Sequence, residues 1–182
     1  KIMVPDLNSW QDIKTGWGSN AAHSQITIAK EYAVISNDLG QTPQKFDGTT
    51  VTPVCLDEAC VPPFSISTYH LRRLFVAGVA TTGSTVYYSA ASDITDWVSE
   101  DTGSLILDDG DGDRVVGLSK PFRDSIYIFK GPNTGSIHKI SGRTIKQLAR
   151  DRISDSAPCV SQHSVITTPN DIYWLSPYGA HS

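Results

Sequence analysis

Short apolar runs with the alternation of β-strands recur along the chain, and turn-forming residues separate them. Such runs, bounded by Gly, Pro, Asn and Asp, are typical of strands. A strand, a turn containing Gly and a second strand predict one β-hairpin over residues 71–89 and another over residues 125–140. The runs are residues 26–35, 71–79, 85–89, 125–130, 136–140 and 171–175.

The predicted hairpins begin at regular intervals. Aligned on Tyr32, Leu74, Ile126 and Ile172, they are spaced by 42, 52 and 46 residues. Repeats of that length suit the blades of a β-propeller, in which small sheets stack around an axis to bury their faces. We therefore predict an all-β, propeller-like domain of several partial blades over residues 1–182. A β-sandwich, which also uses many short strands, is the alternative.

The blade count and the end of the sequence lead to an expectation about length. Four partial blades do not close a ring of complete ones, and we expect the return strand after residues 171–175 to lie beyond this sequence. The chain is thus expected to be a fragment of a longer polypeptide.

Two segments between the runs lack a clear strand pattern. Residues 43–63 hold a Lys-Phe-Asp-Gly turn, two cysteines and a Pro-Pro pair, and are predicted to form a long surface loop. Cys55 and Cys60 are interpreted as two free thiols, with a local disulfide or half of a zinc site as alternatives. Residues 144–152 are either about two turns of helix or a strand with a polar edge.

Composition supports the β assignment and excludes several classes. There are 14 Gly and 10 Pro but one Met and three Glu, so long helices are disfavoured. The formal net charge of −4 offers no overall attraction to nucleic-acid phosphates. No apolar stretch is long enough to span a bilayer, and the first residues do not form a signal peptide. No phosphate loop or other cofactor motif is present, so no cofactor is expected.

The segment from Arg72 to Gly142 carries a distinctive order of strands and turns. It runs from an arginine and a strand through Tyr-Tyr-Ser, an acidic segment ending in Trp, Asp-Gly-Asp and hydrophobic-Gly-Leu to a charged turn and a strand. This order resembles the propeller-containing hub and nozzle proteins of short-tailed bacteriophages. The residues that carry it are 72–78, 86–89, 92–97, 108–118 and 122–130, and residues 171–179 fit the next element.

The resemblance implies a virion structural protein that is not an enzyme. Such proteins assemble as homo-oligomeric rings at the tail or portal, retain packaged DNA and form part of the channel for DNA ejection. The implied partners are copies of the chain, other tail, portal or adaptor proteins, and DNA passing non-specifically through the lumen. The implied location is the phage tail, after synthesis in the host cytoplasm.

The acidic run 108–113 is the most conspicuous chemical motif. Asp109, Asp111 and Asp113 match the alternating carboxylates that open a calcium loop. The second half of that loop fails, because Arg114 stands where its glycine is needed and Lys120 where its glutamate is needed. A tight acidic turn, in which Asp side chains cap backbone amides, is therefore favoured over a weak calcium site.

No set of residues predicts catalysis. Residues 92–97 resemble the Asp-box turn of sialidases but lack its central Gly, and that turn is structural. Arg72 and Arg73 are expected in one strand, where they point to opposite faces and cannot clamp a carboxylate. The five histidines are dispersed. Two alternatives stay open: a module that binds glycans or a receptor through Trp97 or Trp174, and a hydrolase whose active site lies in missing sequence.

Acidic and basic residues are segregated along the chain. Residues 93–113 hold eight acidic residues and no basic one, whereas residues 139–152 hold five basic residues and one acid. Opposite charges favour a head-to-tail contact between subunits, with phosphate contacts or simple solvation as alternatives. The interface candidates are Asp93, Asp96, Asp108, Asp109, Lys139, Arg143, Lys146, Arg150 and Arg152.

Overall fold

The structure, a computed structural model, describes the chain except residues 1, 6–9, 18–19, 56–59, 143 and 145–146. It is built from antiparallel sheets, and no α-helix occurs among the described residues. The predicted all-β class is confirmed. No helix in the described part of the chain has the length and apolar character needed to cross a membrane.

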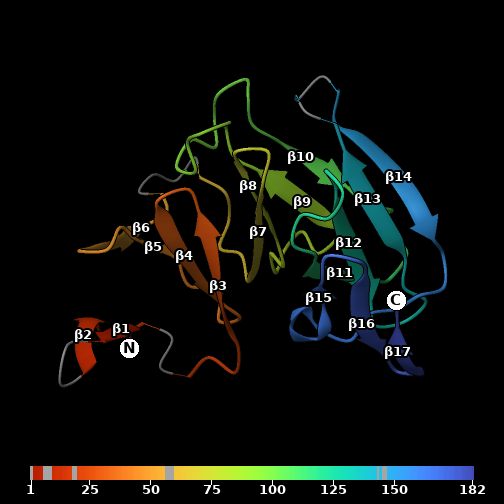
Figure 1. Cartoon of the computed structure of the whole chain (residues 1–182), viewed down its shortest axis with the longest axis horizontal. Coiled ribbons are helices and arrows are strands. Elements are labelled where there is room, and N and C mark those ends of the chain that lie inside the picture. The colour runs from red at the N-terminus through yellow and green to blue at the C-terminus, as the bar shows by residue number, and fades with distance from the viewer. Residues whose placement is uncertain (1, 6–9, 18–19, 56–59, 143, 145–146) are drawn as a thin grey trace.

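A hairpin is followed by four sheets in which neighbouring strands follow one another in sequence (Figure 1). The hairpin is β1 (Ile2–Pro5) and β2 (Trp10–Lys14). The first sheet is β3 (Ser24–Ala29), β4 (Tyr32–Asn37), β5 (Gln44–Phe46) and β6 (Val51–Pro53). The second sheet is β7 (Ile66–His70), β8 (Arg73–Ala77), β9 (Thr85–Tyr88) and β10 (Gly103–Ile106). The third sheet is β11 (Arg114–Leu118), β12 (Ile126–Gly131), β13 (Ile137–Ser141) and β14 (Ala149–Ser154). The fourth sheet is β15 (Ile166–Thr167), β16 (Ile172–Ser176) and β17 (Gly179–His181).

Each of the four sheets starts with the same hairpin. In each hairpin, two turn residues separate the last pair of opposed residues. In chain order these pairs are Ala29 and Tyr32, His70 and Arg73, Phe122 and Ser125, and Thr168 and Asp171. In the second and third sheets both turn residues have positive φ, as a tight type I′ hairpin requires. These turns are Leu71-Arg72 and Arg123-Asp124, so the chain forms them without glycine.

The common register fixes which face of each sheet packs on which neighbour. Leu74 and Val76 of β8 pack toward the first sheet, whereas Phe75 and Ala77 pack toward the third. Ile126 and Ile128 of β12 pack against the preceding sheet, the second, just as Leu74 and Val76 of β8 pack against the first. Because successive side chains of a strand point to opposite faces, every internal sheet buries both of its faces.

The first strands of the four sheets lie next to one another. β3 contacts β7, β7 contacts β11, and β11 contacts the 3-10 segment η2 (Gln162–Ser164) that precedes β15. Two glutamine side chains bridge these strand edges. Gln25 exchanges hydrogen bonds of 3.0 and 2.9 Å with the backbone of Ser67, and Gln162 does the same with Leu118 at 3.0 and 2.6 Å. Each amide replaces a strand partner at an edge that would otherwise be unpaired.

Several predictions about individual segments are wrong. Residues 26–35 form two strands joined at Lys30-Glu31 rather than one. The predicted loop 43–63 contains β5 and β6, which are too short for a periodicity signal. The return strand of the last hairpin is present as β17. Residues 149–154 form the strand β14, which agrees with the strand alternative for residues 144–152.

Two further corrections concern the arginine pair and the cysteines. Arg72 lies in the β7–β8 turn with a φ of 63°, so it does not share a strand with Arg73. The expectation of two free thiols at Cys55 and Cys60 is also wrong, because the structure pairs them as a disulfide with a Cα–Cα distance of 6.0 Å. Cys159 is the buried free thiol among the described residues, and burial raises its pKa.

Candidate functional site

The acidic loop 108–113 sits between the second and third sheets and is held by hydrogen bonds at both of its ends. The Asp113 carboxylate is buried and accepts hydrogen bonds from the Asn133 amide at 2.8 Å, the Thr134 hydroxyl at 3.1 Å and the Gly135 amide at 2.7 Å. Burial alone would raise the pKa of Asp113, but the hydrogen bonds from Gly135 and Asn133 outweigh it and lower the pKa. Asp113 is therefore an ionised cap for the β12–β13 turn.

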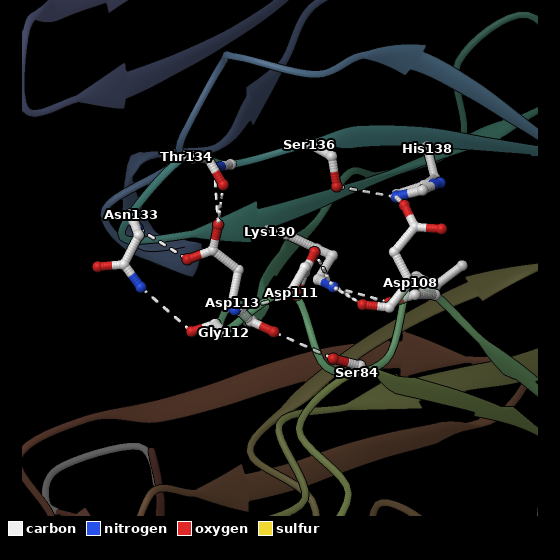
Figure 2. A network of polar contacts seen from close by, with 12 residues as sticks. Ser84, Asp108, Asp111, Gly112, Asp113, Lys130, Asn133, Thr134, Ser136 and His138 are labelled. Atoms are coloured by element: carbon white, nitrogen blue, oxygen red, sulfur yellow. Dashed lines mark hydrogen bonds and ion pairs between the residues drawn. The ribbon is translucent and has the colours of Figure 1, made fainter.

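Lys130 supplies a buried positive charge to the same loop. Its Nζ donates to the Leu107 carbonyl at 2.7 Å, the Asp108 carbonyl at 3.1 Å and the Asp111 carboxylate at 2.7 Å. The side chain of Lys130 is 0% exposed, and its three ammonium protons have three acceptors. Figure 2 shows Lys130 reaching Asp111 while Asp113 faces Asn133 and Thr134.

His138 on β13 extends this network. Its Nε2 lies 2.9 Å from the Ser136 hydroxyl and 3.2 Å from the Asp108 carboxylate. Arg150 and Arg152 of β14 approach the same carboxylate at 3.7 and 3.4 Å. Burial lowers the pKa of His138, and the nearby Asp108 charge opposes this only in part. His138 is therefore held as a neutral imidazole.

The Ser136, His138 and Asp108 side chains do not form a catalytic triad. In a triad the acid binds the ring nitrogen opposite the one that contacts the serine. Here both partners share Nε2, and the buried Nδ1 makes no hydrogen bond within the described structure. Ser136 is only 2% exposed, so a substrate would not reach its hydroxyl. This network is suited to holding the third sheet together rather than to nucleophilic chemistry.

The calcium candidates are not brought together. Asp111 binds Lys130, Asp113 caps the following turn, and Asp109 is exposed. The described residues contain no group of three or more His, Cys, Asp or Glu placed to hold a metal ion. The two carbonyls and one carboxylate that converge in this loop do so on the Lys130 ammonium, so the lysine takes the place that a cation would occupy.

The acidic interface candidates make local contacts within the chain. Asp93 accepts hydrogen bonds from the Thr95 amide and hydroxyl, and Asp96 accepts them from the amides of Val98 and Ser99. Hydrogen bonds from the Thr95 side chain and amide lower the pKa of Asp93, and those from the Ser99 side chain, the Ser99 amide and the Val98 amide lower the pKa of Asp96. They are turn caps of the kind that Asp side chains commonly form.

The acidic and basic runs meet inside one molecule. Asp108 lies against Arg150 and Arg152, so part of the charge complementarity assigned to a subunit contact is already used between a loop and β14. Lys139 is half-buried on β13. Arg143 and Lys146 lie outside the described residues. The loop after β10 and the strand β14 are far apart in the sequence, and they meet because the second and third sheets pack against each other.

Three buried groups were not predicted as functional or structural centres. Lys130 and His138 carry the network above, and Arg73 binds the Ser89 carbonyl at 2.9 Å and Asp101 at 2.5 Å. A signal for Lys130 exists in the sequence, since alternation puts it on the same face as Ile126 and Ile128. Arg73 ties β8 to the loop that resembles an Asp-box, because Asp101 also accepts from the Ala91 amide.

Two grooves lie along the edges of the first strands. One of about 450 Å³ is lined by parts of β3, β7, residues 118–121 and residues 162–167. The other, of about 370 Å³, is lined by residues that include His23, Asp38, Arg114 and His163. The His23 and His163 rings approach to 4.9 Å between centroids and connect the start of the first sheet with η2. Neither groove contains the tryptophans considered for glycan binding.

No protein-family model matches the chain. No curated protein matches it either.

Proposed function

We propose that this chain is a β-propeller-type structural module of a bacteriophage tail, in a hub, nozzle or adaptor ring. In this role it forms part of the channel that retains packaged DNA and then releases it. The proposed location is the virion, after synthesis in the host cytoplasm, and the proposed partners are copies of the chain and other tail or portal proteins. The link to a phage rests on the order of motifs between Arg72 and Gly142.

The observation that carries the structural role is the repeat of one sheet-packing rule. Four sheets start with the same hairpin. The first strands of the first three sheets lie side by side, and η2 before the fourth sheet continues the row. Each internal sheet sends one alternating set of side chains backward and the other forward. Such an arrangement is what successive propeller blades require. A β-sandwich fits less well, because it has two packed sheets rather than a series.

A mechanical rather than catalytic role is supported by how the polar groups are used. Lys130 is fully buried, and its ammonium is hydrogen-bonded to Asp111 and to two carbonyls, so it joins the second sheet's last loop to the third sheet. Satisfied buried polar contacts of this kind favour rigidity and a unique arrangement. The glycan-binding alternative has less support, because Trp174 is 9% exposed and packs on Phe129, and Trp97 packs against the core between the first two sheets.

The proposal is tested on purified phage particles from the source of this sequence. Mass spectrometry is expected to find the chain in the particles, and gold-labelled antibody is expected to mark the tail end in electron micrographs. Particles made without it are expected to lose their DNA to added nuclease, while wild-type particles keep it. Absence of the chain from tailed particles, or labelling confined to the capsid, would refute the proposal.

A further inference from the structure

One pocket lies where the first strands of successive sheets begin. It has a volume of about 370 Å³, and the first residues of β3, β7 and β11 line it together with η2. These lining residues are Ser24, Ile66, Arg114, Gln162 and His163. Because they come from three sheets and from the segment that leads into the fourth, the pocket brings together residues that are far apart in the sequence.

A pair of histidines stands at this pocket. His23 directly precedes β3 and His163 lies in η2, yet their rings are 4.9 Å apart between centroids and tilted by 45°. Both side chains are exposed. The His23 amide donates to the Asp38 carboxylate at 3.2 Å, and the His163 amide donates to the Ser161 hydroxyl at 3.1 Å. Within the described structure the polar contacts of the two histidines use backbone atoms, so their ring nitrogens are left for a ligand.

We infer that His23 and His163 together bind one divalent transition-metal ion, such as Zn²⁺, through a ring nitrogen of each. Neutral imidazole is the commonest protein ligand for such ions. With metal–nitrogen bonds of about 2.0–2.1 Å, two imidazoles on one ion at a tetrahedral angle have their ring centres roughly 5 Å apart. The separation of 4.9 Å agrees with this geometry. The described residues gather no third His, Cys, Asp or Glu for an ion, so water from the pocket completes its coordination.

The charged residues of the pocket bear on which kind of ion it takes. Asp38 and Arg114 both line it. The Asp38 carboxylate lies against the backbone of His23 and favours a cation there, whereas the Arg114 guanidinium opposes a cation. An anion held by Arg114 is the alternative ligand, and it has less support because the Asp38 carboxylate shares the pocket.

A shared ion fastens the two ends of the row of first strands. β3 contacts β7, β7 contacts β11 and β11 contacts η2, and the histidine pair connects η2 back to the start of β3. An unfolded chain would have to close a long loop to bring the two imidazoles together, so the ion binds the folded chain preferentially and stabilises it. The inference goes beyond the proposed function and does not depend on it.

The test is isothermal titration calorimetry of the purified chain with zinc chloride at neutral pH. The wild type is expected to bind one Zn²⁺ per chain. His23→Gln and His163→Gln are each expected to weaken binding by at least about tenfold, because changing even a group that only orients a metal ligand costs about 10–100-fold in affinity. The matched control His181→Gln removes an imidazole from β17 and is expected to bind like the wild type. Arg114→Gln removes a positive charge from the pocket and is expected to bind Zn²⁺ at least as tightly as the wild type.

Thermal melting gives a second readout. Without zinc, both histidine variants are expected to melt like the wild type, because the changed side chains are exposed. Added Zn²⁺ is expected to raise the melting temperature of the wild type but not of either variant, and acidification is expected to remove the effect because a protonated imidazole cannot bind a metal. Mg²⁺ is expected to have no effect, since it prefers oxygen ligands.

Several results would overturn the inference. A wild type that binds no zinc would do so, as would a loss of binding in only one of the two histidine variants, which indicates a single imidazole. Equal weakening by His181→Gln would indicate scattered surface binding, and an equal response to Mg²⁺ would indicate carboxylate ligands. None of these results bears on whether the chain is found in phage tails, which the particle experiment decides.

Discussion

Replacing Lys130 with Met tests whether the buried ammonium holds the acidic loop. The substitution keeps most of the side chain's volume but removes the donors to Asp111 and to the Leu107 carbonyl, and Leu107 is fully buried. Breaking a buried ion pair from one side costs about 3–5 kcal/mol. Because the Asp111 side chain is 26% exposed, water can solvate part of it, and we expect a loss near the lower end, about 3 kcal/mol.

The measurement is urea unfolding followed by tryptophan fluorescence, with thermal melting as a second readout. For a chain of this size, a loss of about 3 kcal/mol corresponds to a melting temperature lower by roughly 6–12 °C. Lys139→Met, which removes a half-buried lysine from the neighbouring strand β13, is the matched control and is expected to change stability by less than about 1 kcal/mol.

A double-mutant cycle separates the ion pair from general disruption of the core. Asp111→Asn alone leaves the ammonium without its carboxylate partner, so it is expected to destabilise the fold. The combined variant Lys130→Met/Asp111→Asn is expected to be less destabilised than the sum of the single changes, because no buried charge is left unpaired. Strict additivity, or a Lys130→Met protein as stable as the control, would refute this account of the loop.

Three further predictions address other parts of the structure. Asp113→Asn is expected to lower stability at neutral pH by about 1–3 kcal/mol and to flatten the acid limb of unfolding. The pKa of Asp113 is lowered in the folded chain, so its ionised carboxylate stabilises the fold above the ordinary value of 3.8, and this stabilisation is lost as the pH falls through the folded pKa. The pKa of His138 is lowered by folding, so the unfolded chain binds more protons; the resulting stabilisation is present above the ordinary histidine value of 6.5 and falls on acidification below it. His138→Gln is expected to reduce the slope of unfolding free energy against pH between about pH 7.5 and 5.5. The slope is not expected to vanish, because burial also lowers the pKa of His70. An unchanged slope would contradict the assignment to His138. Gln162→Ala is expected to speed hydrogen exchange at the Leu118 amide, which donates to the Gln162 side chain at 2.6 Å, while amides within β12 exchange as in the wild type; equal acceleration in both places would count against a local bridge.

Local pattern was sufficient where a strand was long enough to show it. The hairpins over residues 71–89 and 125–140 were predicted because apolar alternation and glycine turns agree there. β5 and β6 were missed because three residues cannot show a period of two. The Lys30-Glu31 and Leu71-Arg72 turns were missed because they reach positive φ without the glycine or asparagine that usually marks it.

The sequence by itself determined the all-β class, the repeat of hairpins and the acidic turn, since each depends on residues close together in the chain. Only the tertiary structure decided which charges pair, because Asp108 in the loop after β10 and Arg152 on β14 are far apart in the sequence and meet only when the sheets pack. It also decided that Lys130 is buried as the cation of the acidic loop. Burial and partner choice depend on how whole sheets pack, and that information is not present in any single strand's pattern.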